Sequence, residues 1–142
     1  MNAPPKINYN PQNNIFMLRS VMRCVGVDIV EIARLEKAIA RHGEGFLKRI
    51  YTDSEIKLYR KKLPSLAARF AAKEAVVKAL GKPAKDISLK EIEILSSPGG
   101  QPIVNLYGKT QQQAKGMGLG KLAITISHSK EYAVAFVSGD TK

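Results

Sequence analysis

The sequence contains no tryptophan and a single cysteine, and each shortage narrows the classes of protein to consider. With aromatic residues at only 6% and apolar residues at 44%, the core must be packed mainly by aliphatic side chains and alanine. Cys24, the one cysteine, excludes an intramolecular disulfide and a multi-cysteine metal site. A reducing cytoplasm is therefore the expected compartment, and Cys24, at the start of an apolar run, is predicted to be a small core residue.

Acidic residues are also scarce, because 12 Asp and Glu face 23 Lys and Arg and leave a formal charge of +11. A chain this basic is expected to bind an acidic partner. A nucleic acid, an anionic membrane, an acidic protein and a phosphate-rich small molecule all fit, and charge alone does not choose among them. No apolar run approaches the ~20 residues that a membrane helix needs. The first residues, rich in proline and asparagine, do not form the apolar centre of a signal peptide.

The 142 residues fit one domain, residues 23–142, preceded by a flexible leader over residues 1–22 that shows no periodicity. The spacing of apolar residues and the turn residues predict the elements of this domain. In chain order they are a strand over 24–30, a helix from Glu31 ended by Gly43, a short helix after a Thr52–Glu55 capping box, a helix over 66–80 closed by Gly81, a hairpin of 91–96 and 102–107 around Pro98-Gly99-Gly100, a short helix over 109–115, and strands over 122–127 and 132–137.

The helix over 66–80 is predicted to be central and largely buried, because alanines form one ridge and larger apolar residues a second stripe. Its charged residues do not form a solvated face. Lys73 lies within the apolar stripe and Glu74 at its border. A buried charge needs a partner, and two interpretations remain open. One is a set of ion pairs such as Glu74 with Lys78, and the other is a carboxylate for a metal beside cations for phosphates.

Asp28 interrupts an apolar, β-branched strand, where aspartate is unfavourable. Its side chain either caps the helix that begins near Glu31 or is a metal ligand at the end of the strand. Two carboxylates, Asp28 and Glu74, with the remaining positions open to water suit Mg²⁺, which often binds substrate phosphates.

Several segments, in the right order over about residues 24–137, resemble the holo-[acyl-carrier-protein] synthases. The opening segment is Gly26-Val27-Asp28-Ile29-Val30-Glu31-Ile32 with Arg34, and the second is Arg69-Phe70-Ala71-Ala72-Lys73-Glu74-Ala75 with Lys78. Between and after them lie Arg49-Ile50-Tyr51-Thr52 with Glu55, Gly100-Gln101-Pro102, and Ile126-Ser127-His128-Ser129-Lys130-Glu131-Tyr132-Ala133.

This resemblance implies an Mg²⁺-dependent enzyme that moves 4'-phosphopantetheine from coenzyme A to a serine of apo acyl carrier protein, for fatty acid biosynthesis, and releases adenosine 3',5'-bisphosphate. It implies an α+β fold in which a central buried helix packs on a mainly antiparallel sheet, and a homotrimer with active sites between subunits. By motif position Asp28 and Glu74 hold the metal and are catalytic together with Lys78. The positions near the coenzyme A phosphates are Arg69, Lys73, Lys78 and His128, and those on the helix that meets the carrier are Arg34 and Arg41.

The chain departs from the family after Gly81, where Lys82-Pro83 replaces the usual Thr-Gly pair. His128 alone is also compatible with a structural role beside strands. The proton acceptor for the serine is left open among Glu74, a metal-bound water and another carboxylate. Two other functions are compatible with the chain's basic charge or its motifs. A longer transferase with two similar halves is disfavoured by the single copy of each motif, and a nucleic-acid-binding domain is disfavoured by the lack of a recognised motif.

Overall fold

Two antiparallel sheets and four α-helices make up the part of the chain that the structure describes, residues 22–81 and 86–141 of a computed structural model. The elements are β1 (Met22–Glu31), α1 (Ile32–Ile50), α2 (Asp53–Tyr59), α3 (Leu63–Leu80), the 3₁₀ turn η3 (Leu89–Glu91), β2 (Ile92–Ser96), β3 (Pro102–Leu106), α4 (Gly108–Gly116), β4 (Ala123–His128) and β5 (Tyr132–Thr141). The predicted leader lies outside the described residues except for Met22, which begins β1.

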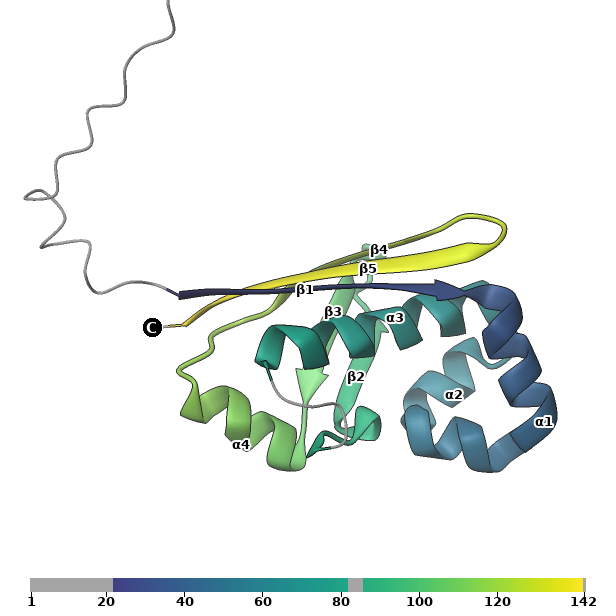
Figure 1. Cartoon of the computed structure of the whole chain (residues 1–142), viewed down its shortest axis with the longest axis horizontal. Coiled ribbons are helices and arrows are strands. Elements are labelled where there is room, and N and C mark those ends of the chain that lie inside the picture. The colour runs from purple at the N-terminus through teal and green to yellow at the C-terminus, as the bar shows by residue number, and fades with distance from the viewer. Residues whose placement is uncertain (1–21, 82–85, 142) are drawn as a thin grey trace, which may run out of the picture.

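The larger sheet has the strand order β1-β5-β4, and β2 and β3 form a separate hairpin. Every strand pair is antiparallel. Helix α3 lies lengthwise along the three-stranded sheet, with α1 and α2 grouped near one end of it and α4 near the other (Figure 1). The predicted α+β fold, a central helix on a mainly antiparallel sheet, is therefore confirmed.

Helix α3 is buried on nearly every side, as its two apolar surfaces predict. It begins at Leu63, three residues before the predicted start, because Pro64 occupies the first turn, where a missing N–H costs nothing. Gly81 ends it in the left-handed conformation, with φ of 67°. Across the described residues, no helix is both long enough and apolar enough to cross a membrane.

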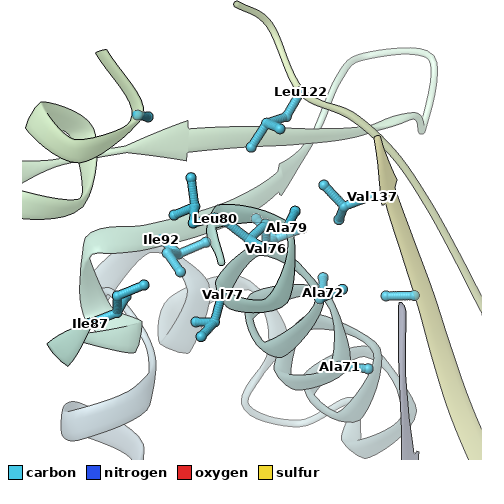
Figure 2. Close-up of a cluster of buried hydrophobic side chains, with 14 residues drawn as sticks. Ala71, Ala72, Val76, Val77, Ala79, Leu80, Ile87, Ile92, Leu122 and Val137 are labelled. Carbon is cyan, nitrogen blue, oxygen red and sulfur yellow. The ribbon is translucent and has the colours of Figure 1, made fainter. Parts of the chain in front are cut away.

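The core is built mainly from aliphatic side chains and alanine, as the scarcity of aromatic residues requires. Alanines and valines of α3 meet Ile87, Ile92, Leu122 and Val137 from the surrounding segments (Figure 2). A second cluster joins α1 to the first turns of α3 through Leu35, Leu47, Tyr51 and Leu66. The two clusters fix both ends of α3, so a side chain on this helix has a well-defined place relative to β1.

Three local predictions are tested by the backbone. The Thr52–Glu55 capping box is present, with Glu55 N donating to Thr52 Oγ1 at 3.3 Å and Thr52 N to Glu55 Oε2 at 2.8 Å. The hairpin turn around Pro98-Gly99-Gly100 joins β2 to β3. The prediction that Gly43 ends the first helical segment is confirmed, because its φ of 58° and ψ of −141° are not helical and interrupt α1 there, and a second helical segment then continues to Ile50.

Candidate active site

Asp28 and Glu74, which are 46 positions apart in the sequence, line the same cleft of about 360 Å³. Asp28 is paired with Ala135 of β5, a buried residue, so its side chain lies on the sheet face that packs against α3. Glu74 comes from α3 and is half-buried. The structure therefore brings together the two carboxylates that sequence reasoning singled out.

A glycine holds β1 and α3 at the separation that this cleft needs. A Cβ atom on Gly26 would overlap the carbonyl oxygen of Ala75 and come within 2.9 Å of Ala79 N. Real Cβ atoms do not approach backbone that closely, so only glycine fits at position 26. The close contact lies two residues before Asp28 and one residue after Glu74, and it therefore sets the approach of the two carboxylates.

The electrostatics of the cleft favour a cation. Burial and the charge of Asp28 both raise the pKa of the Glu74 carboxyl, and Lys78 partly offsets them. Lys78 Nζ forms an ion pair with Asp28 Oδ1 at 3.0 Å and also donates to Val27 O at 3.0 Å. The ion-pair partner of Lys78 is therefore Asp28, which lies on another element.

The chemistry of this pair fits Mg²⁺. Carboxylate oxygens are the ligands this ion prefers, and it commonly binds through one or two of them while keeping several waters. Among the described residues, no group of three or more His, Cys, Asp and Glu is placed to hold a metal. Asp28 and Glu74 would therefore leave most coordination positions to water and to substrate oxygens.

Lys73 does not occupy the phosphate-binding position predicted for it. Its side chain is fully buried and pairs with the equally buried Glu55, with Nζ and Oε2 2.8 Å apart. The same ammonium donates to Leu89 O at 3.0 Å and to Ile92 O. Because a lysine has three N–H donors and all three are engaged inside the protein, Lys73 is a structural residue. Burial lowers its pKa, and Glu55 opposes that shift.

Arg69 is also buried, at 4% exposure. Its guanidinium stacks on Tyr59, 3.4 Å from the ring centroid, and donates to Ile94 O at 3.0 Å, Ser96 Oγ at 3.0 Å and Ser65 O at 3.3 Å. Five N–H groups minus these three leave two for another ligand. The phosphate contact predicted for Arg69 stays a prediction.

Charged side chains occupy the edge of β2 that faces away from β3. Ile94 N donates to Glu55 Oε1 at 2.8 Å, Arg69 binds Ile94 O, and Lys73 binds Ile92 O. A strand edge normally pairs with another strand, and unpaired buried backbone groups are costly. Glu55, Arg69 and Lys73 therefore do for β2 what a third strand of the hairpin sheet would do.

The other predicted residues lie at the surface. His128 is exposed at the end of β4. Arg34 and Arg41 are exposed on α1 and line a hollow of about 680 Å³ together with Lys37 and His42. Arg34 also lines the carboxylate cleft, so the hollow and the cleft adjoin. The unusual Lys82-Pro83 loop lies outside the described residues.

Sequence reasoning missed two kinds of residue in and around the site. The apolar wall of the cleft includes Phe46 and Phe70, and Glu31 adds a third carboxylate to its lining. Phe70 lies one turn before Glu74 on α3, and this helical spacing could have predicted that the two side chains line the same cleft. The Glu55–Lys73 pair had no such signal, because its members lie 18 positions apart on different helices.

Comparison with known proteins gives the family. Residues 24–137 match the model of the 4'-phosphopantetheinyl transferase superfamily. The chain is 52% identical over 116 residues to a holo-[acyl-carrier-protein] synthase of Dehalococcoides mccartyi, which covers 82% of this chain and 97% of that protein. A synthase of the same name from Herpetosiphon aurantiacus is 40% identical over 125 residues, 83% of this chain and 98% of that one. Such near-complete coverage favours the short type of transferase over the longer one with two similar halves.

Solved structures agree with the sequence relatives. Holo-[acyl-carrier-protein] synthase of Helicobacter pylori in complex with coenzyme A superposes with a TM-score of 0.72 at 38% identity, over 80% of this chain and 96% of that one. The ACPS–CoA complex named for Chronobacterium ammoniagenes gives a TM-score of 0.76 at 29% identity, over 85% and 98%. The matched family model, the relatives and the folds all lead to one conclusion, that this chain belongs to the 4'-phosphopantetheinyl transferase superfamily, among the holo-[acyl-carrier-protein] synthases.

Proposed function

We propose that this enzyme transfers 4'-phosphopantetheine from coenzyme A to a serine of apo acyl carrier protein, with Mg²⁺, and releases adenosine 3',5'-bisphosphate. The observation that carries the proposal is the cleft in which Asp28, Glu74 and Lys78 meet, two carboxylates for a cation beside an ammonium for phosphate. The names of the relatives supply the carrier, and their complexes supply coenzyme A. The reaction would serve fatty acid biosynthesis in the cytoplasm.

Asp28 and Glu74 are the residues that would hold Mg²⁺, whose chemistry is to polarise a phosphoryl oxygen and neutralise charge that develops there. The protein's own task in phosphoryl transfer is mainly to position the reactants and to stabilise charge. Lys78, more than half exposed, can reach a phosphate oxygen as a point charge. Arg69, with two N–H groups left, and His128, exposed on β4, are proposed as further phosphate contacts.

The attacking serine of the carrier must lose its hydroxyl proton. Besides Asp28, which is paired with Lys78, the cleft is lined by two carboxylates that can accept this proton, Glu74 and Glu31. Burial and the nearby charge of Asp28 raise the pKa of Glu74, and this makes its carboxylate a better proton acceptor. We assign the proton to a carboxylate of this cleft, because the serine must reach the same cleft to meet the phosphate.

The hollow on α1 is the proposed docking site for the carrier. Its lining carries Arg34, Lys37 and Arg41, so it presents positive charge directly beside the carboxylate cleft. Charge complementarity with an acidic protein speeds association and fixes its orientation. Transfer to the carrier is therefore expected to slow as salt rises, because added ions screen charges beyond about 10 Å at 0.1 M.

The outer face of the three-stranded sheet supports the proposed homotrimer. Val27 of β1 lies opposite Phe136 of β5, and Ile29 lies opposite Val134. These four side chains are 37–64% exposed and lie together on the face away from α3. A contiguous apolar face of this kind is typical of a surface that another chain covers. The purified protein should therefore have the mass of three chains by light scattering, and a monomer at micromolar concentration would contradict the trimer.

The test of the function is a change in the mass of the carrier. Purified protein, coenzyme A, Mg²⁺ and an apo acyl carrier protein should give a carrier heavier by one phosphopantetheine, measured by intact-protein mass spectrometry. Omission of Mg²⁺ with added chelator should abolish the change. The proposal fails if a known synthase modifies the same carrier and this protein does not.

A further inference from the structure

Lys78, the proposed phosphate ligand, is already engaged by two groups of the protein itself. Its ammonium lies 3.0 Å from Asp28 Oδ1 and 3.0 Å from Val27 O, and both groups belong to β1. The side chain of Lys78 is 55% exposed, whereas that of Asp28 is only 18% exposed. The lysine therefore bends from the surface of α3 towards a carboxylate that is largely withdrawn from solvent.

We propose that Lys78 is a displaceable counter-ion of Asp28, which a divalent cation releases and which then becomes a phosphate ligand. The inference rests on the proposed function, because it takes Asp28 and Glu74 as the metal-binding pair. It adds that one ammonium serves two partners in turn, first the carboxylate and afterwards the substrate.

The charges around Lys78 make this exchange favourable. Asp28 and Glu74 are the carboxylates that face it, and a dication between them would satisfy both. An ammonium held 3.0 Å from the same Asp28 would then be repelled by the cation at short range. The pair that is given up is weak, because a partly exposed ion pair contributes little to stability.

The lysine side chain suits such a movement. Four methylenes and a compact charge allow the ammonium to swing without moving its backbone, and Lys78 is exposed enough to do so. Lys73, one turn and a residue earlier on α3, is the opposite case, because it is enclosed and holds three internal partners. Of the two lysines of α3, Lys73 is thus built into the fold and Lys78 can change partners.

The exchange predicts an order of binding. With Lys78 on Asp28, the cleft offers a neutralised carboxylate and no free ammonium. Once a dication takes the carboxylate, the freed ammonium adds a positive donor beside it. The phosphates of the substrate would therefore meet a complete set of positive charges only after the cation has bound.

Binding of Mn²⁺ alone, followed by electron paramagnetic resonance of the free ion, tests the first half. Lys78→Met should bind Mn²⁺ at least about fivefold more tightly than the wild type, because no ammonium competes for Asp28. Arg34→Met is the matched control, since it removes a positive charge that lines the same cleft but has no bond to Asp28. It should change the affinity by less than about twofold. Equal effects of the two variants, or weaker binding in Lys78→Met, would overturn the proposal.

Acylation of lysines by an amine-reactive ester, read peptide by peptide by mass spectrometry, tests the second half on the wild-type chain. Saturating Mg²⁺ should raise the labelling of Lys78 at least about threefold and leave that of Lys37, exposed on α1, unchanged. Asp28→Asn without metal should label Lys78 as fast as the metal-loaded wild type. If Mg²⁺ does not change the labelling of Lys78, the inference is overturned. The proposed function is tested separately by the mass change of the carrier, so failure of one can be distinguished from failure of the other. A wild type that binds no Mn²⁺ overturns the inference as well.

Discussion

Replacement of Glu74 by glutamine is expected to lower the rate of phosphopantetheine transfer on the order of 10³-fold while the chain stays folded. Glutamine keeps the size of the side chain but removes one of the two carboxylates that converge in the cleft. Stabilisation of charge by a bound metal contributes several kcal/mol to such reactions, and each 1.36 kcal/mol is tenfold in rate. Initial rates of carrier modification at saturating coenzyme A and Mg²⁺ measure the effect.

Stability should not explain the loss. Burial and Asp28 already disfavour the charged form of Glu74, so a neutral side chain relieves rather than creates unfavourable charge. The urea midpoint of Glu74→Gln is expected to equal or exceed that of the wild type. Glu44→Gln is the matched control, because Glu44 makes a surface ion pair with Arg60 away from the cleft and should keep the wild-type rate. A rate of Glu74→Gln within tenfold of the wild type would remove Glu74 from the metal site.

Replacement of Lys73 by methionine is expected to cost about 3–5 kcal/mol of the free energy of unfolding. Methionine fills similar space but leaves the buried carboxylate of Glu55 without its counter-ion and two backbone oxygens without a donor. Domains are commonly stable by only about 5–15 kcal/mol, so this loss is large. Urea denaturation at fixed protein concentration, followed by circular dichroism, measures it.

Two further variants separate the effect of the buried Lys73–Glu55 ion pair from the effect of removing any lysine. Lys57→Met removes an exposed lysine from α2 and should change stability by no more than about 0.5 kcal/mol. Lys73→Met combined with Glu55→Gln removes both charges, so it should be more stable than the sum of the two single changes implies. If Lys73→Met unfolds at the urea midpoint of the wild type, the buried Lys73–Glu55 pair does not contribute the stability expected of it.

How far the sequence predicts the site depends on how local each contact is. The elements that hold the site were largely predictable, because helix ends and strands are encoded by nearby residues such as the Thr52–Glu55 capping box. The sequence also indicated that Asp28 and Glu74 are carboxylates in energetically unfavourable positions, since each lies among apolar residues of its own strand or helix. Their convergence was implied only by the family resemblance, because it depends on the close approach of β1 and α3 at Gly26, which no local pattern specifies.

Lys73 shows where pattern reasoning stops. Periodicity correctly places it in an apolar stripe and indicates that its charge needs a partner. The partner is Glu55, whose local role as a capping residue gave no sign of a second contact. A family motif describes which residues recur, but it does not distinguish a lysine that holds the edge of β2 from one that binds substrate. Only the arrangement of α2, α3 and β2 in space makes that distinction.

The strand order β1-β5-β4 has a consequence for how the protein is made. The first described strand pairs along its length with the last, from Met22 opposite Thr141 to Glu31 opposite Tyr132. A ribosome makes β1 about 100 residues before β5, at about 5–20 residues per second. The strand that carries Asp28 therefore waits several seconds for its partner during synthesis, with apolar side chains uncovered. The three-stranded sheet that holds Asp28 in place can therefore form only after β5 has been made.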